Sequence, residues 1–288
     1  VSALLADQTR ESVRTKGMAL IGASIGLMFA LSLVVGPLLS AWGGLPGIFW
    51  ITSVLAVGGI AVVLWWTPAE VPGPPETAHS SSASVWTVLR MPDLARLNLG
   101  VFILYTVQLA TWVAVPALLI QAGVEKSLHG WVYLPAVLLS FVVMGATLFP
   151  MERRGRLRPL FLVSIASVML VQVALIWQTM GSPSLAVIGF LLFVFFCGFN
   201  VLEASQPSLA SRLAPAATRG TVLGIYNTLQ SLGIFAGGAL GGWLAKSQGA
   251  QGLFMACALL MALWLVVAWG MAPPRPTAPH LATDHTNP

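Results

Sequence analysis

Apolar residues in this chain are grouped in long blocks separated by short polar segments. The blocks lack both the strict alternation of a half-buried strand and the narrow stripe of an amphipathic surface helix. A helix needs about 20 mostly apolar residues to cross a bilayer, and in lipid its backbone groups must pair within the segment. Eight blocks are long enough, so we predict transmembrane helices at roughly Gly17–Ser40, Gly47–Trp66, Leu94–Gln121, Gly130–Met151, Pro159–Met180, Ser184–Leu209, Gly220–Ala245 and Ala250–Ala272.

Composition supports lipid as the surrounding solvent. Hydrophobic residues make up 57% of the 288 residues and charged residues only 8%, against roughly a quarter charged in soluble globular proteins. The two cysteines, Cys197 and Cys257, fall inside predicted helices and show no disulfide or metal-ligand spacing. We therefore predict an all-α integral membrane protein with no metal site and no bound cofactor.

Basic residues are distributed unequally between the loops on the two sides of the predicted helices. Lys and Arg are retained on the cytoplasmic side of short loops, and only Lys126 and Lys246 of the 14 lie on the opposite set. This distribution predicts that both ends of the chain are cytoplasmic. It also accounts for the isoelectric point of about 9.8, so no nucleic-acid partner is expected.

The first two predicted helices resemble the last two at an ungapped shift of 205 residues. The identical pairs are Arg14 with Arg219, Gly36 with Gly241, Gly47 with Gly252, Phe49 with Phe254 and Pro68 with Pro273. The shift spans six helices, an even number that preserves orientation across the membrane. Parallel repeats of this kind are typical of transporters that are built from two six-helix halves.

The repeat predicts a domain organisation. If the last six helices form one complete half, the other half should hold four more helices before Gly17, so we expect about 8 of 12 helices and a truncated N-terminus. The segment after Trp66 is rich in Pro, Ser and Ala, which is typical of a linker. We predict the remnant of an N-terminal half at 1–66, a cytoplasmic linker at 67–93, a C-terminal six-helix half at 94–272 and a cytoplasmic tail at 273–288.

Specific motifs resemble a known family. Asp7, within Ala6-Asp7-Gln8-Thr9-Arg10-Glu11, and Arg14 precede a helix with Gly22, Gly26 and the pair Gly36-Pro37. This arrangement is similar to the drug:proton antiporters of the major facilitator superfamily, in which a glycine-rich helix ending in Gly-Pro is called the antiporter motif. The stretches Asn200-Val-Leu-Glu203 and Gly224–Gly233 resemble YajR-type members of that superfamily.

The resemblance implies several properties of the complete protein. It implies the major facilitator fold in a bacterial cytoplasmic (inner) membrane, a monomer in the lipid bilayer, and a small-molecule substrate. It also implies a proton gradient as the energy source, and a cytoplasmic gate loop that contains Asp7 and Arg14. The Gly-Pro motif favours export over import.

Glu203 is the one acidic residue of the nine that falls inside a predicted helix. An acidic group at mid-membrane costs about 3 kcal/mol or more, so it usually faces a polar cavity or a partner. One interpretation makes Glu203 a proton-coupling or cation-binding group. The other places it near the cytoplasmic end of its helix, where it would pair with Arg212 or Arg219 and latch the two halves together.

Other polar residues at membrane depth could line a cavity. The candidates for substrate contact are Asn200, Tyr226, Asn227 and Gln230. Tyr105, Gln108 and Gln172 lie at similar depth. Interhelical hydrogen bonds would also explain these side chains. We favour cavity lining for Tyr226, Asn227 and Gln230, and both interpretations stay open for Gln108 and Gln172.

Glycines recur at four-residue spacing in two of the helices. Gly22 and Gly26 lie in the first helix, and Gly233, Gly237 and Gly241 lie in the seventh. Such spacing allows close approach of helices. Packing is the preferred interpretation, and smooth contacts between moving halves are the functional alternative. We also expect Gly36-Pro37 to bend or end the first helix.

Taken together, the sequence predicts a secondary active transporter that exports a drug or metabolite by proton-coupled antiport. The alternative on the same fold is a proton-coupled importer, or symporter, of a small nutrient. A polytopic membrane enzyme is disfavoured, because no cluster of carboxylates, histidines and a nucleophile gathers at one membrane face. We therefore expect no enzymatic activity.

Overall fold

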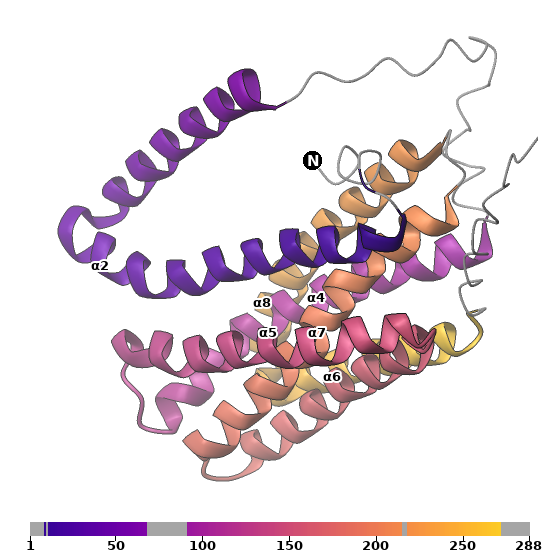
Figure 1. Ribbon diagram of the computed structural model, residues 1–288. Helices are drawn as coiled ribbons and strands as arrows, with labels where there is room; N and C mark the ends of the chain where they lie inside the picture. Colours follow the sequence, from indigo (N-terminus) through magenta and orange to yellow (C-terminus); the bar gives the residue numbers. More distant parts are fainter. Residues whose placement is uncertain (1–8, 10, 68–90, 215–217, 272–288) are drawn as a thin grey trace, which may run out of the picture.

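The computed structural model describes residues 9, 11–67, 91–214 and 218–271, and all regular elements in these ranges are helical (Figure 1). Mostly apolar segments of this length are stable as helices in lipid, because each backbone group pairs within its own segment. The predicted all-α membrane architecture is confirmed. The elements are α2 (Glu11–Trp66), α4 (Pro92–Gln121), the short 3-10 helix η1 (Lys126–Leu128), α5 (His129–Arg153), α6 (Leu157–Met180), α7 (Leu185–Leu213) and α8 (Arg219–Trp269).

Two elements, α2 and α8, each combine two of the predicted membrane helices. Gly44 interrupts α2 with φ 59°, and Gly249 interrupts α8 with φ 72°. Glycine adopts these left-handed torsions without the clash that a Cβ atom would cause. Each of the eight predicted ranges therefore coincides with a helix or with one arm of a bent helix.

Length supports the division of α8 into two arms. Within the described part of the chain, six helical stretches are long and apolar enough to cross a membrane, and one of them is the 51-residue α8. At 1.5 Å per residue, α8 would be about 75 Å long if it were straight, more than twice the thickness of the hydrocarbon core. The bend at Gly249 lets its two arms cross separately.

The expected break at Gly36-Pro37 is not where α2 changes direction. Helical conformation continues through both residues, and the non-helical torsion lies further along the chain at Gly44. A proline removes one backbone hydrogen bond, but the neighbouring bonds of an apolar helix in lipid remain strongly favoured. The turn occurs instead at a glycine, which can adopt positive φ.

Helix α4 and the first arm of α8 pack backbone against backbone. Gly233, Gly237 and Gly241 are buried on one face of α8. A Cβ atom at Gly233 would lie 2.5 Å from the Phe102 carbonyl oxygen, and one at Gly241 would lie 2.9 Å from Cα of Ala110. The absence of side chains at these positions lets the two backbones touch. The Thr106 hydroxyl adds a 3.2 Å hydrogen bond to the Gly233 carbonyl.

The second arm of α8 is held by a buried tryptophan. Trp264 is 0% exposed and packs edge-on against Phe161 of α6, with ring centroids 5.8 Å apart. A Cβ atom at Gly100 of α4 would lie 2.5 Å from the Trp264 indole nitrogen. Gly100 thus provides the space that this ring occupies between α4 and α6.

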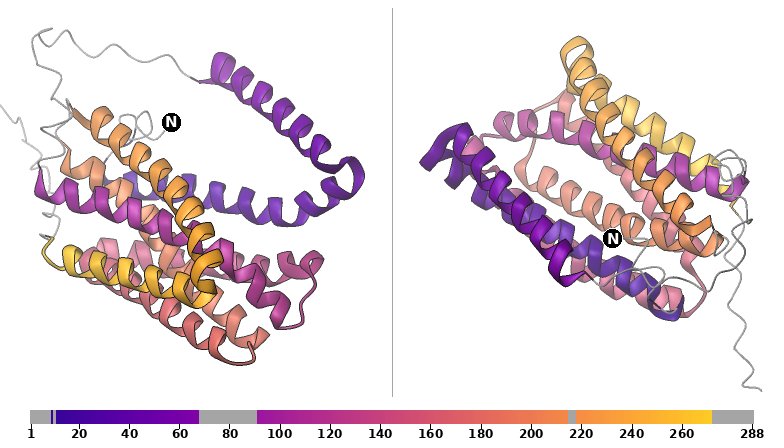
Figure 2. Two further views of the ribbon diagram at one scale, coloured as in Figure 1. Left: turned by 180° about the vertical axis from the view of Figure 1, so that it is seen from behind. Right: turned by 90° about the horizontal axis from the view of Figure 1, so that it is seen from above.

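The two arms of α2 form a V whose first arm alone packs on the bundle (Figures 1 and 2). The first arm contacts α5 and α7, and Gly26 lies so close to Phe141 of α5 that a Cβ atom would overlap the ring. The second arm, Trp42–Trp66, is 0% buried over its most apolar window. Its side chains are therefore free to contact lipid.

Arginines tie helix ends together at one end of the bundle, which we call the arginine-bearing end. Arg96 near the start of α4 donates to Asp93 at 3.0 Å and to the Gly270 carbonyl at 2.8 Å. Arg158 near the start of α6 donates to the Trp269 carbonyl at 2.7 Å. Cations at a helix C-terminus satisfy its free carbonyls and offset its dipole, so these contacts fix the end of α8.

Candidate functional site around Glu203

Glu203 is positioned by α7 with its carboxylate toward α4. The Tyr105 hydroxyl on α4 donates a 2.9 Å hydrogen bond to Glu203 Oε1. Tyr105 is 6% exposed, and its ring packs edge-on against Phe199 of α7, with centroids 5.7 Å apart. Glu203 itself is partly exposed. The carboxylate therefore accepts one hydrogen bond, and its donor is a neutral phenol.

The first arm of α8 supplies two more polar groups to this site. The Tyr226 side chain is 3% exposed and lies within electrostatic range of Glu203. Gln230, one turn further along α8, lies beside the Tyr105 side chain. On the α2 side, a Cβ atom at Gly22 would lie 4.0 Å from Cγ of Glu203. Three helices of the bundle and the first arm of α2 thus meet at this carboxylate.

The cytoplasmic latch predicted as an alternative for Glu203 is not formed. Arg212 makes its ion pair with Glu152 of α5, and Arg219 donates to the Ser211 carbonyl at 3.4 Å. Within the described ranges, no salt bridge involves Glu203. The helix end is therefore tied by Glu152 and Arg212, while Glu203 is bonded to a phenol.

Several of the polar residues predicted at membrane depth form interhelical hydrogen bonds. Asn200 is 5% exposed and donates to the Ser140 hydroxyl of α5 at 2.7 Å. Gln172 of α6 is 0% exposed and donates to the Thr111 hydroxyl at 3.2 Å. These bonds join α5 to α7 and α4 to α6. Asn227, in contrast, is exposed beside the buried Tyr226.

The remaining predicted positions lie on or before α2. Gly22, Gly26 and Gly36 are partly buried in its first arm. No atom lies within 4 Å of a Cβ placed at Gly36. Asp7 and the side chains of Arg14 and Pro37 lie outside the described residues. The predicted gate loop and half of the Gly-Pro motif therefore have no described contacts.

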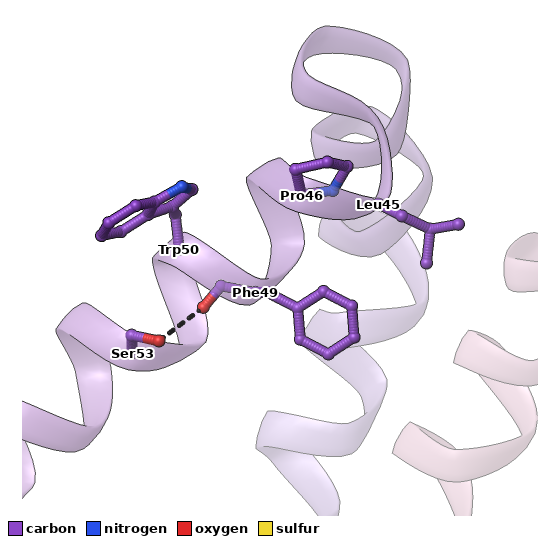
Figure 3. Close-up of a pocket in the computed structure, with 5 residues that line it drawn as sticks. All are labelled: Leu45, Pro46, Phe49, Trp50 and Ser53. Carbon is purple, nitrogen blue, oxygen red and sulfur yellow. Dashed lines mark hydrogen bonds between the residues drawn. The ribbon is translucent and has the colours of Figure 1, made fainter.

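A hollow of about 410 Å³ lies at the bend of α2, away from Glu203 (Figure 3). It is open, and most of its lining is apolar, with Leu45, Pro46, Phe49, Trp50 and Ser53 around it. The Ser53 hydroxyl is already bonded to the Phe49 carbonyl at 2.9 Å. Since every lining residue belongs to one short stretch of α2, the hollow offers no convergent polar groups for a specific ligand.

The chemistry available around Glu203 is proton exchange and cation contact. A carboxyl group can bind and release one proton, and the Tyr105 hydroxyl can bond to its oxygen in either state. Across the described ranges, no group of three or more His, Cys, Asp or Glu could hold a metal ion. Sequence reasoning placed Tyr105 only among the undecided polar residues. The feature of the sequence that could have drawn attention to Tyr105 is the scarcity of tyrosine, since Tyr105 and Tyr226 are two of only three in the chain.

Comparisons with known proteins identify the family. The profile of the Major Facilitator Superfamily matches residues 1–238. The chain is 37% identical over 275 residues to the "Inner membrane transport protein YajR" of Escherichia coli, covering 95% of this chain and 60% of that protein. It is 29% identical over 238 residues to an uncharacterized transporter of Buchnera aphidicola, covering 82% of this chain and 60% of that protein.

A solved structure supports the fold. The human organic anion transporter MFSD10 (TETRAN) superposes with a TM-score of 0.67 at 20% identity, over 93% of this chain and 66% of that one. The chain thus spans about 60% of the length of the curated relatives it matches. These relatives are transporters, not enzymes. On the family match and the 37% identity, this chain belongs to the major facilitator superfamily of membrane transporters.

Proposed function

We propose that the protein to which this chain belongs exports a small molecule by proton-coupled antiport, and that Glu203 is the proton-coupling group. The observation that carries the proposal is the 2.9 Å bond between Tyr105 and Glu203, at the junction of α4, α7, α8 and the first arm of α2. In an antiporter, the same group binds a proton in one step and releases it when substrate binds. A partly exposed carboxylate held by a neutral phenol is suited to this exchange.

The location of Glu203 also supports the coupling role. Transporters of this family bind substrate near the midplane, at the interface between two halves that rock against each other. Glu203 lies on the surface of the six-helix bundle that faces Gly22 of α2. A change in protonation at this contact would alter how the two parts pack. Gln230 and Tyr226 lie beside it as candidates for substrate contact.

The proposal also includes the direction of transport, the membrane that holds the protein and the orientation of the chain in that membrane. Export is favoured by the resemblance of Gly22, Gly26 and Gly36-Pro37 to the antiporter motif. A bacterial inner membrane location is favoured by the printed name of the relative with 37% identity. The distribution of Lys and Arg favours cytoplasmic ends for this chain. The proton gradient supplies the energy, and the functional unit is a monomer.

The test uses the complete gene product in inverted bacterial membrane vesicles with a pH-sensitive dye. Respiration acidifies the vesicles, and a library of drug-like compounds and metabolites is screened for those that release protons. We expect the response to an active compound to be lost in Glu203→Gln and kept in Glu125→Gln, which alters an exposed loop carboxylate. Undiminished proton flux in Glu203→Gln would remove Glu203 from the mechanism. Compound movement in the direction of import would replace export by symport.

A further inference from the structure

Two buried amides, one on α7 and one on α4, have side-chain atoms with no hydrogen-bonding partner among the described residues. Gln206 of α7 is 0% exposed, and neither Nε2 nor Oε1 is bonded. Asn98 of α4 is 4% exposed, and its Nδ2 is unbonded. The buried Gln172, by comparison, is bonded to Thr111. Buried polar groups nearly always have a protein or water partner, so these two amides indicate sites for ordered water.

Both amides lie on the same side of the Tyr105–Glu203 hydrogen bond. Gln206 follows Glu203 by three residues, about one turn toward the end of α7. Asn98 precedes Tyr105 by seven residues, two turns toward the start of α4 and on the same face. Helices α4 and α7 are separated by three reversals of the chain, so they run antiparallel. The two amides are thus both displaced toward the arginine-bearing end.

On the premise that Glu203 couples proton movement, we propose that Gln206 and Asn98 hold a short chain of water molecules. This chain carries protons between Glu203 and the arginine-bearing end of the bundle. A proton leaves the Glu203 carboxyl oxygen for the first water, which passes one of its own protons onward, so one O–H bond forms for each that breaks. The amides stay neutral, because their role is to accept from and donate to the waters.

The groups that face Glu203 leave this route open. Tyr105 on α4 and Tyr226 on α8 are the titratable side chains near it in the described ranges, and α2 presents Gly22. None of these is a cation that would hold the carboxylate permanently charged. In the proposed route, the proton acceptor next to Glu203 on the Gln206 side is a water molecule.

The experiment follows the protonation of Glu203 directly, with a proton pulse as the probe. A light-triggered acid releases protons around the complete gene product in lipid bilayers, and time-resolved infrared spectroscopy records the carboxylic C=O band that disappears in Glu203→Gln. In Gln206→Leu and Asn98→Leu we expect this band to rise about tenfold more slowly, with its final amplitude unchanged. Gln206→Ser keeps a hydroxyl and leaves room for water, so it should stay near the wild-type rate.

Gln172→Leu is the matched control, because it replaces another fully buried amide that lies outside the proposed route, and it should not change the rate. A full final amplitude shows that a variant is folded around Glu203. If Gln206→Leu loses amplitude, Asn98→Leu provides the same comparison. Unchanged rates with the band present would overturn the water chain and leave the proposed function intact. If the wild-type protein shows no carboxylic C=O band of Glu203 that changes after the proton pulse, both the water chain and the proposed function are overturned.

Discussion

The Tyr105 hydroxyl and the Glu203 carboxylate, 98 residues apart in the chain, share a 2.9 Å hydrogen bond between α4 and α7. A charged or polar group at membrane depth gains most from a partner, because lipid offers none. Tyr105 is also packed edge-on against Phe199, so its hydroxyl is held in place by the ring contact. The pair thus joins the two helices and positions the carboxylate.

Tyr105→Phe should keep the ring packing and remove the bond to Glu203. We expect the free energy of unfolding, measured by detergent-induced unfolding, to fall by about 1 kcal/mol, as for other interhelical hydrogen bonds in membranes. Combining Tyr105→Phe with Glu203→Leu should cost less than the sum of the single changes, because each removes the same bond. Strict additivity would show that the bond does not contribute to stability.

Gly237→Ala should separate α8 from α4. A Cβ atom there would meet the Thr106 carbonyl oxygen and lie 3.0 Å from Cβ of Leu109. We expect a loss of about 2 kcal/mol in the free energy of unfolding, as for overpacked cores. Gly242→Ala is the control in the same helix, since no atom lies within 4 Å of its Cβ position. That change should be neutral or stabilising by up to about 1 kcal/mol. Equal effects of the two changes would contradict the packing described here.

Glu152→Gln should destabilise the arginine-bearing end by leaving Arg212 without its carboxylate. The two side chains are only 15% and 20% exposed, so we expect a loss of about 2 kcal/mol, between the values for exposed and buried pairs. Asp93→Asn removes the more exposed pair with Arg96, in which the side chains are 36% and 34% exposed. It should cost about 0.5 kcal/mol or less. The same detergent-unfolding assay compares the two variants. A larger loss for Asp93→Asn than for Glu152→Gln would contradict the assignment of the Glu152–Arg212 pair as the stronger contact.

Asn200→Ala and Ser140→Ala should have similar effects, because each removes the 2.7 Å bond between α5 and α7. We expect each to lower the free energy of unfolding by about 1 kcal/mol without changing which compounds are transported. Gln230→Ala, next to Tyr105, should instead change the response to individual compounds in the vesicle assay. A change in which compounds Asn200→Ala transports would indicate that Asn200 lines the substrate cavity.

The helices could be predicted closely from the sequence, because the requirement that fixes them is local. Each segment must satisfy its own backbone in lipid, so apolar length alone marks a helix. The two sharp bends fall between predicted helices, at Gly44 and Gly249, where glycine tolerates positive φ. The helix does not end at Gly36-Pro37, because a proline in an apolar helix removes one bond and leaves the others in place.

Sequence alone determined the number and approximate limits of the helices, the membrane setting, and Glu203 as an isolated acid at membrane depth. Only the tertiary structure decided its partner, because helical periodicity defines the faces of each helix but not which faces meet. Tyr105 therefore became the partner of Glu203, while Arg212, nine residues from Glu203 in the chain, is bonded to Glu152. The unbonded amides of Gln206 and Asn98 likewise became visible only after the helices were packed together.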